Sequence, residues 1–411
     1  MNTDILILGA GIGGYETFRT LAKLLKRHRI NKQITIVDQN NYFTFVPMLH
    51  EAAAGSVEPY HCAIPLRELI YKTPHQFIKT TVKKIDPTKK IVETADGVIQ
   101  YETCVVALGS GVNYFDTPGA EQHTYHVRSL KGALRLHYDV IELLEDNVTS
   151  QFTITVVGGG FTGVEVAGQF SDFIRKDMKE LYPHMTVDIR LIETGELLAK
   201  SMHKRVQEKV TKRLRQMGVR LHLKSRVKEV KKRSIILDSG EELPSDITIW
   251  TTGFQNLATC FLSEGYCENG RVPVTGMLCH EKDSSLFALG DIMLRRDAET
   301  KIPFPQLAEA AHKEGIFVAH AIIRQCKKLP LRNFTFRPLG TLMPVGDWWG
   351  VMTLGKFILF GPLAWWIRRT VYLLFMPGLL RKLKIVIDWT LHSFGFRYIL
   401  SVLPEDKKWR K

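Results

Sequence analysis

Residues 5–14 read Ile-Leu-Ile-Leu-Gly-Ala-Gly-Ile-Gly-Gly, an apolar run that ends in a cluster of glycines. A helical pattern follows over residues 15–27, and residues 34–37 form a second apolar run that closes with Asp38. The order strand, glycine turn, helix, strand, acid is typical of a βαβ unit. The chain is therefore expected to begin with part of a parallel sheet.

The same pattern returns far downstream. Residues 153–157 lead into Gly-Gly-Gly-Phe-Thr-Gly at 158–163, a helical stretch follows, and residues 188–192, Asp-Ile-Arg-Leu-Ile, end at Glu193. In such a loop the first glycine makes a tight turn, the second lets backbone approach a pyrophosphate, and the third lets helix pack on strand. Two loops of this kind, a domain length apart, predict two bound dinucleotides.

Each glycine loop opens a helix whose first N–H groups are available to phosphate. The expected phosphate-binding residues are Gly9, Gly11, Gly13 and Gly14 in the first loop and Gly158, Gly160, Phe161, Thr162 and Gly163 in the second. Asp38 and Glu193 are placed to accept hydrogen bonds from ribose hydroxyls. Glu193 should also select NADH, because a 2′-phosphate would meet its charge and no arginine occurs in the three residues after it.

Composition sets wider limits. A chain of 411 residues is long enough for two or three domains, and its 56 Lys and Arg against 42 Asp and Glu give a net charge of +14. An anionic partner is indicated, which could be nucleic acid, acidic lipid or a phosphate-bearing cofactor.

The six cysteines form no Cys-x-x-Cys pair, so reduced thiols are expected and no metal site. The first residues lack a secretory signal pattern, which favours a cytoplasmic catalytic body.

The two halves also repeat each other beyond the glycines. Short strands at 82–85 and 91–94 form a predicted hairpin in the first half, and 226–230 with 234–237 form another in the second. From about Pro338 the sequence becomes densely apolar and aromatic with interleaved Arg and Lys, which indicates a separate C-terminal module.

With these features in place, the chain resembles the type II NADH dehydrogenases, single-subunit and non-pumping NADH:quinone oxidoreductases. The resemblance covers nearly the whole length and is carried by residues 41–49, 52–55, 158–168, 288–291 and 338–341. It implies an enzyme that transfers electrons from NADH through non-covalently bound FAD to a quinone. Because no segment is expected to cross the bilayer, no proton pumping is expected.

The fold that the resemblance implies is α/β, with two Rossmann-like dinucleotide-binding domains and a C-terminal amphipathic helical membrane module. The FAD domain would be discontinuous, comprising residues 1–115 and 271–337. A connection at 116–150 would lead to an inserted NADH domain at 151–270. The membrane-association module would span 338–411.

The resemblance also assigns site residues. The FAD site would include the first glycine loop with Asp38, Gln39, Pro47, Ala107, Gly109, Gly290, Asp291 and Ala308, and the NADH site would add Glu193 and Gly253 to the second loop. Glu165 matches a family glutamate tied to catalysis near the junction of nicotinamide and flavin. An acid in the first turn of a helix is also favoured by the helix dipole, so a purely structural role for Glu165 stays open.

The expected quinone pocket consists of Met48, Gln306, Glu309, Ala310 and Lys313. The family usually carries two glutamines here, at the positions of Glu309 and Lys313. An acid and a lysine spaced i, i+4 on a helix can pair with each other. The identity of the electron acceptor therefore stays open between an unusual quinone and another molecule.

The tail is expected to lie on a membrane surface rather than to span it. A spanning helix needs about 20 mostly apolar residues, and the longest run, 357–367, is interrupted by Gly361-Pro362. The apolar faces would come from Trp365, Trp366, Leu373, Leu374, Phe375, Ile385, Val386 and Trp389. Attraction to anionic lipid would come from Arg368, Arg369, Arg381, Lys382 and Lys384, with Lys407, Lys408, Arg410 and Lys411 at the end.

Other interpretations stay open. The apolar tail could pack on the protein's own core or form a homodimer. The chain could be a reductase of a small redox protein, or a flavin- and NADH-binding sensor or assembly partner without turnover. No nucleic-acid partner is expected, since no basic groove with interleaved aromatics is visible. The favoured location is the cytoplasmic side of the cell membrane, as a peripheral protein.

Overall fold

The computed structural model describes residues 1–145, 151–296, 303–304, 306–376 and 378–394. The chain divides into two compact units. Unit 1 comprises Met1–Phe45, Ala63–Gly111 and Phe254–Pro338, and unit 2 comprises Val46–Cys62, Val112–Gly253 and Leu339–Lys411.

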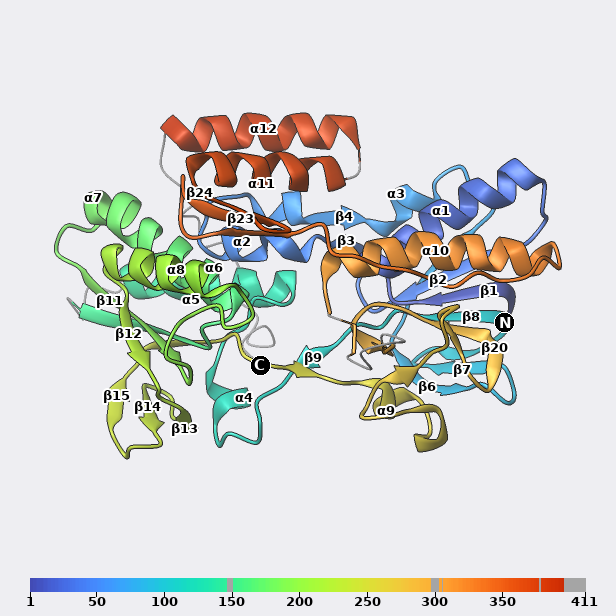
Figure 1. Cartoon of the computed structure of the whole chain (residues 1–411), viewed down its shortest axis with the longest axis horizontal. Helices are drawn as coiled ribbons and strands as arrows, with labels where there is room; N and C mark the ends of the chain where they lie inside the picture. The colour runs from blue at the N-terminus through green and yellow to red at the C-terminus, as the bar shows by residue number, and fades with distance from the viewer. Residues whose placement is uncertain (146–150, 297–302, 305, 377, 395–411) are drawn as a thin grey trace. The chain divides into compact units, whose positions relative to one another are not determined.

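A mostly parallel sheet forms the centre of unit 1 (Figure 1). Its parallel strands, in spatial order, are β20 (Asp283–Ala288), β8 (Gly97–Val106), β1 (Asn2–Leu8), β2 (Ile34–Asp38) and β5 (Gln76–Lys79). The antiparallel strands are β19 (Cys279–His280) beside β20, and the hairpin of β6 (Val82–Asp86) and β7 (Ile91–Thr94), which pairs with β8. The first predicted hairpin is thus confirmed. The carboxyl-terminal parts of the central strands, Ile5–Leu8 of β1 and Cys104–Val106 of β8, are apolar and fully buried, as expected where both faces of a sheet are covered.

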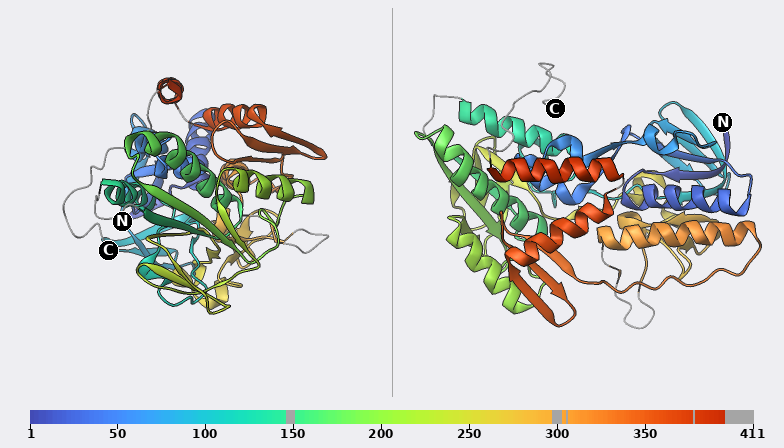
Figure 2. Two further views of the ribbon diagram at one scale, coloured as in Figure 1. Left: turned by 90° about the vertical axis from the view of Figure 1, so that its left-hand side faces the viewer. Right: turned by 90° about the horizontal axis from the view of Figure 1, so that it is seen from above.

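Two helices lie side by side in unit 1, α1 (Ile12–His28) and α10 (Ala308–Cys326) (Figures 1 and 2). Their close approach depends on glycine, because a Cβ on Gly315 would lie 2.5 Å from the carbonyl oxygen of Gly13. This contact brings a helix from the third segment of unit 1 against the helix that follows the first glycine loop.

The smaller elements of unit 1 border the sheet. They are β3 (Tyr42–Thr44), β4 (Ala63–Pro65), α3 (Leu66–Ile70), α9 (Ala258–Phe261), β18 (Val272–Pro273), η5 (Gly290–Ile292) and β21 (Met293–Leu294).

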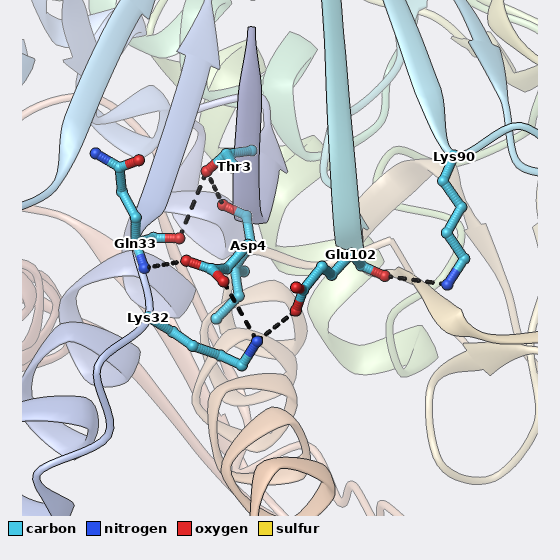
Figure 3. Close-up of polar contacts among 7 residues, drawn as sticks. Thr3, Asp4, Lys32, Gln33, Lys90 and Glu102 are labelled. Carbon is cyan, nitrogen blue, oxygen red and sulfur yellow. Dashed lines mark hydrogen bonds and ion pairs between the residues drawn. The ribbon is translucent and has the colours of Figure 1, made fainter.

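Polar contacts fix the amino-terminal edge of this sheet (Figure 3). The carboxylate of Asp4 accepts the N–H of Gln33 at 2.7 Å and lies 3.4 Å from Lys32 Nζ, which also pairs with Glu102. These bonds join the start of β1 to the residues before β2 and to β8. The glycine loop lies at the opposite, carboxyl-terminal edge of the strands.

Unit 2 contains a second parallel sheet with the order β12-β11-β10-β16. Its strands are β10 (Gln151–Val157), β11 (Thr186–Glu193), β12 (Arg220–Leu223) and β16 (Ile247–Trp250). The helices of this region are α4 (Ala120–His123), α5 (Leu130–Glu145), α6 (Phe161–Asp172), a π-helix at Phe173–Met178, α7 (Lys179–Leu181) and α8 (Lys204–Gln216). An antiparallel sheet of β13 (Val227–Val230), β14 (Ser234–Leu237) and β15 (Glu242–Pro244) contains the second predicted hairpin.

The segment Val46–Cys62 belongs to unit 2 although the residues before it and after it in the sequence belong to unit 1. It forms η1 (Val46–Met48), α2 (Leu49–Ala53) and η2 (Pro59–Cys62). Ser56 Oγ lies 2.8 Å from Gln169 Oε1 of α6, and His137 Nδ1 of α5 lies 3.2 Å from the carbonyl oxygen of Ala53. This segment therefore packs against the helices of the second dinucleotide unit.

The C-terminal part of unit 2 is a three-stranded antiparallel sheet followed by two helices. The strands are β22 (Thr341–Pro344), β23 (Gly350–Leu354) and β24 (Phe357–Gly361), and the helices are α11 (Pro362–Phe375) and α12 (Leu379–Phe394). Helix α11 packs on all three strands (Figure 2). Among the residues that the structure describes, no helix combines the length and the apolar character needed to cross a bilayer.

Candidate functional site: two dinucleotide loops and a buried ion pair

The first glycine loop joins β1 to α1 in unit 1. Gly9 has φ +93°, which disfavours other residues, and a Cβ on Gly14 would overlap the carbonyl oxygen of Gly9. Around a Cβ placed on Gly11, by contrast, no described atom lies within 4 Å, and the first turn of α1 has no side-chain cap. The loop thus combines tight packing beneath with open space and free N–H groups above, as a pyrophosphate requires.

Asp38 lies where the sequence predicts, at the end of β2 beside this loop. Its carboxylate accepts the backbone N–H of Ala10 at 2.7 Å and that of Asn40 at 2.8 Å. Burial raises the pKa of Asp38, and these two hydrogen bonds oppose the rise. Each oxygen keeps a second lone pair that can accept a ribose hydroxyl. The following residue, Gln39, is exposed.

The remaining FAD residues predicted in unit 1 follow neighbouring strands of the same sheet. Ala107 and Gly109 come after β8, and Gly290 and Asp291 come after β20, so all four lie at the carboxyl edge near the loop. Asp291 accepts a hydrogen bond from Ser110 Oγ at 2.6 Å. Ala308 is the first residue of α10. Pro47 belongs to unit 2 instead, and its assignment to FAD stays a prediction.

Glu314 is a residue of this site that the sequence reasoning missed. It lies on α10, is only 2% exposed, and accepts the backbone N–H of Gly290 at 2.7 Å. Burial raises its pKa to about 7, with Asp291 adding to the rise and the Gly290 hydrogen bond opposing it. Glu314 thereby holds the Gly290-Asp291 turn in place. An acid directly before the helix-packing Gly315 was the only signal in the sequence.

The second loop repeats this geometry in unit 2. Gly158 has φ +105°, a Cβ on Gly163 would overlap the carbonyl oxygen of Gly158, and Gly160 faces open space. Phe161 and Thr162 form the first turn of α6, which has no side-chain cap. Gly253, with φ +73°, follows β16. The second loop therefore has the same unfilled anion-binding end as the first.

Glu193 is the last residue of β11, the strand position expected from the sequence. Its carboxylate accepts the N–H of Gly159 at 2.6 Å and the N–H of Gly195 at 2.8 Å. A cavity of about 680 Å³ opens at this point and is lined by Gly158, Glu193 and Thr252 among others. That volume is in the range of small-molecule and cofactor sites.

Two cations also line this cavity, Lys224 and Arg226. They follow β12, the strand beside β11, and the backbone N–H of Ser225 bonds to the carbonyl oxygen of Glu193 at 3.0 Å. The sequence reasoning considered only the three residues directly after Glu193 and so missed them. Parallel pairing of β11 with β12 brings them to the cavity, and that pairing is not visible in local sequence.

Glu165 lies on α6, one turn into the helix, with its side chain 15% exposed. Burial raises its pKa to about 8, Arg368 lowers it, and Glu51 raises it further. Its carboxylate oxygen Oε2 is 3.7 Å from His50 Nδ1. An acid with this pKa exchanges a proton near neutral pH, which suits a role in acid–base chemistry.

Arg368 was expected to face anionic lipid, and this prediction is wrong. Its side chain is 1% exposed and forms an ion pair with Glu51, also 1% exposed, at 2.5 Å from Nη1 to Oε1. Arg368 Nη2 also donates to the carbonyl oxygen of Pro47 at 3.1 Å. A buried arginine without a partner would destabilise the folded protein strongly, and the carboxylate of Glu51 compensates the charge of Arg368.

Arg369 is likewise buried, at 6% exposure, between two aromatic rings. Its guanidinium carbon lies 3.9 Å from the ring centre of Trp365 and 4.5 Å from that of Trp389. Trp365 and Ile385 are almost fully buried and Trp389 is 8% exposed, so they do not form an exposed apolar face either. Through the Arg368–Glu51 pair the tail therefore packs partly against the rest of unit 2, in line with the alternative that it packs on the protein's own core.

Other tail residues do project outward. Trp366, Leu374, Phe375 and Val386 are exposed by 41–68%, as the sequence analysis expected. Further exposed apolar residues on the same helices are Leu363, Leu379, Leu380, Leu383, Ile387 and Leu391. Lys407, Lys408, Arg410 and Lys411 lie outside the described residues.

The predicted quinone residues fall in different units. Met48 belongs to unit 2, whereas Gln306, Glu309, Ala310 and Lys313 belong to unit 1. The expected pairing of Glu309 with Lys313 is confirmed, with Lys313 Nζ 2.7 Å from Glu309 Oε1. Gln306 donates to the carbonyl oxygen of Asp291 at 2.9 Å.

A parallel sheet with a glycine loop and acid at its carboxyl edge, present twice, defines an oxidoreductase architecture that binds two dinucleotides. The chain belongs to the pyridine nucleotide-disulphide oxidoreductase family, whose model matches residues 3–315. The six cysteines, all in described positions, are unpaired. A disulfide is therefore absent from the described part of this family member.

Relatives confirm the resemblance to type II NADH dehydrogenases. The chain is 26% identical over 410 residues to a probable NADH dehydrogenase of Dictyostelium discoideum, covering 94% of this chain and 89% of the relative. It is also 26% identical over 382 residues to the type II NADH:quinone oxidoreductase of Haemophilus influenzae, covering 84% and 85%. The structure of NDH2 from Plasmodium falciparum in complex with NADH shares the fold, with a TM-score of 0.87, 19% identity, and 97% and 99% of the two chains covered.

Proposed function

We propose that the protein is a membrane-associated, FAD-dependent NADH dehydrogenase that transfers electrons to a quinone without pumping protons. The observation that supports this most is the pairing of two dinucleotide sites of the same geometry in one chain, together with relatives of this activity. FAD is assigned to the loop of Gly9, Gly11 and Gly14, and NADH to the loop of Gly158, Gly160 and Gly163.

The protein's own residues supply binding and orientation. Asp38 and Glu193 would accept hydrogen bonds from the ribose hydroxyls of FAD and NADH, respectively. The N-terminal turns of α1 and α6 would bind the pyrophosphates. FAD, when bound, would supply the two-electron redox chemistry between NADH and the acceptor. Glu165 is the proposed catalytic residue, because its raised pKa lets it hold or release a proton at neutral pH. Glu193 favours NADH over NADPH.

The domain boundaries carried by this proposal are those expected from the sequence. FAD binds to residues 1–115 and 271–337, NADH binds to 151–270, and 116–150 connects them. Within residues 338–411, only the outward-facing side chains provide the membrane contact, because Trp365, Arg368 and Arg369 are buried. Gln306, Glu309, Ala310 and Lys313 of unit 1 remain the proposed quinone residues, and the assignment of Met48 of unit 2 to the acceptor stays a prediction.

Attachment to the membrane is assigned to the outward apolar side chains of α11 and α12, in a peripheral protein on the cytoplasmic side of the cell membrane. Leu374, Leu379, Leu380 and Leu391 are each exposed by 67–77%. Burying one such side chain contributes about 1.5–3 kcal/mol, so several together hold a protein at the interface. Arg381, Lys382 and Lys384 add attraction to anionic headgroups.

Deleting the tail would not test this assignment cleanly, because removal of Arg368 leaves Glu51 buried without its cation. Surface substitution of Leu374, Leu380 and Leu391 to Ser keeps that pair. The variant is expected to lose sedimentation with anionic vesicles while it still oxidises NADH with ferricyanide. A change of oligomeric state without loss of vesicle binding would assign the exposed leucines to a homodimer instead.

Steady-state NADH oxidation tests the proposed activity. With a short-chain quinone the rate should exceed the rate with oxygen alone by at least tenfold. A reductase of a small redox protein would show no such quinone dependence. A protein that binds FAD and NADH but shows no turnover with any acceptor would be a sensor rather than an enzyme.

A further inference from the structure

His50 lies inside unit 2 between two groups from different helices. On one side its Nε2 atom is 3.3 Å from Arg368 Nη2 of α11 and 3.7 Å from Glu51 Oε1 of α2, whose carboxylate pairs with Arg368. On the other side its Nδ1 atom is 3.7 Å from Glu165 Oε2 of α6. The imidazole is 3% exposed, so these contacts, rather than water, set its surroundings.

The direction of the first contact is fixed by chemistry. A guanidinium carries only donors, so Arg368 must donate and His50 Nε2 must accept. Burial, followed by the charge of Arg368, lowers the pKa of His50 to about 3, so the ring is neutral at physiological pH. A neutral ring whose Nε2 accepts carries its one proton on Nδ1. That proton faces Glu165.

We propose that Arg368 fixes the tautomer of His50 and that His50 thereby presents an N–H donor to Glu165, which makes both of them positioning residues for Glu165. This inference rests on the proposed function, because it concerns the acid assigned to catalysis there. It links a buried arginine of the C-terminal helix α11 to the acid beside the second glycine loop. A shift of about 0.5–1 Å closes the 3.7 Å separation to a hydrogen bond.

Glu51 is what holds Arg368 in this position. Burial alone would raise the pKa of Glu51, but Arg368 and Arg369 outweigh it and the pKa is lowered. Glu51 is therefore ionised, and its Oε1 lies 2.5 Å from Arg368 Nη1 while Nη2 points to His50. The planar fork of the guanidinium thus serves the carboxylate and the imidazole with different nitrogens.

The charged and titratable groups facing Glu165 among the described residues of unit 2 are His50 and Glu51 of α2 and Arg368 and Tyr372 of α11. Arg368 favours the ionised form of Glu165 and Glu51 opposes it. A hydrogen bond donated to a carboxylate lowers its pKa, so loss of the His50 donor should raise the pKa of Glu165. The inference predicts this rise in the pKa of Glu165. Replacement of a histidine with a purely structural role would not cause it.

The test uses full-length, FAD-loaded protein and the rate of flavin reduction by NADH as a function of pH. An ionisation present in the parent and absent from Glu165→Gln is assigned to Glu165. Asparagine at position 50 keeps an N–H near the place of Nδ1, whereas leucine has no polar atom. His50→Leu should move the ionisation upward by about 0.5–1 pH unit, a three- to tenfold change in proton affinity, and His50→Asn should not.

His61→Asn is the matched control, since His61 lies in the same segment but pairs with Asp388 at 3.4 Å. It should leave the ionisation in place. An unchanged ionisation in His50→Leu, or equal shifts in His50→Leu and His50→Asn, would overturn the inference. If the parent contains no flavin that NADH reduces, it is the proposed function that fails, and the tautomer remains measurable.

The tautomer itself is read by long-range ¹H–¹⁵N correlation spectra, with His50 assigned by its absence in His50→Asn. The Nδ1–H form is expected in the parent, and the Nε2–H form would contradict the inference. In the double variant Glu51→Gln/Arg368→Gln both charges leave together, and the Nδ1–H preference should weaken. A preference that survives unchanged would show that Arg368 does not set it.

Discussion

Replacing Arg368 by Met should destabilise unit 2 strongly, because it leaves the carboxylate of Glu51 buried without its cation. Both side chains are 1% exposed and their ion pair spans 2.5 Å. Breaking a buried pair by removing one partner costs about 3–5 kcal/mol. The stability that this pair contributes also depends on pH, because the pKa of Glu51 is lower in the folded protein than in the unfolded chain. The contribution is fully present above the unfolded pKa and is lost as the pH falls through the folded pKa.

The double variant Glu51→Gln/Arg368→Met should recover most of that loss, because neither charge is then left alone in the interior. Replacing a buried pair with neutral groups of similar volume is often neutral or stabilising. An exposed pair provides the matched control. Lys231 and Glu242 lie 3.1 Å apart with exposed fractions of 45% and 51%, so Lys231→Met should cost at most about 1 kcal/mol.

Thermal unfolding followed by circular dichroism measures all three variants under one set of conditions. A loss of about 3–5 kcal/mol corresponds to a midpoint lowered by roughly 10 °C for Arg368→Met. If Arg368→Met melts with the parent, Arg368 does not pair with Glu51 inside the protein. An equal loss in the double variant would show that shape, rather than charge, accounts for the effect.

Three further outcomes are expected. Gly163→Ala should abolish bleaching of the flavin by NADH while flavin content stays at the parental level, because its Cβ would overlap the carbonyl oxygen of Gly158; normal NADH titration would refute this. Burial raises the pKa of Glu165 from 4.5 to about 8, so the folded parent holds a proton that the unfolded chain loses and stability falls as pH rises between these values. Glu165→Gln should therefore melt above the parent by most near pH 8, and an unchanged difference between pH 5 and pH 8 would contradict it. Leu374→Ser with Leu380→Ser should lower the affinity for anionic vesicles at least tenfold, and unchanged sedimentation would place the membrane contact elsewhere.

The glycine loops could be predicted because their signal is local. A tight turn, a backbone approach and a helix contact each need glycine at a fixed spacing, and Asp38 and Glu193 follow at the ends of the next strands. The hairpins β6–β7 and β13–β14 were also visible in short stretches. These features depend on interactions between residues that lie near each other in the chain.

The ion pair of Glu51 with Arg368 could not be predicted in this way, because 317 positions separate the two residues. An arginine beside tryptophans in an apolar tail has the composition of a lipid-binding helix, and only the packing of α11 reveals its burial. Lys224 and Arg226 were missed for a related reason, since strand order brings them to the nucleotide cavity. Composition predicted the exposure of Trp366, Leu374, Phe375 and Val386 correctly, and their contact with a membrane stays a prediction.

The central claim is that electrons pass from NADH through FAD to a quinone, and an anaerobic titration tests it most directly. The purified protein should be yellow, lose its flavin absorbance with one equivalent of NADH, and regain it with one equivalent of short-chain quinone. Glu165→Gln, handled in parallel, should complete the same cycle more slowly. Flavin that NADH bleaches but that quinone fails to reoxidise would contradict the assigned acceptor, and a protein without flavin would contradict the account as a whole.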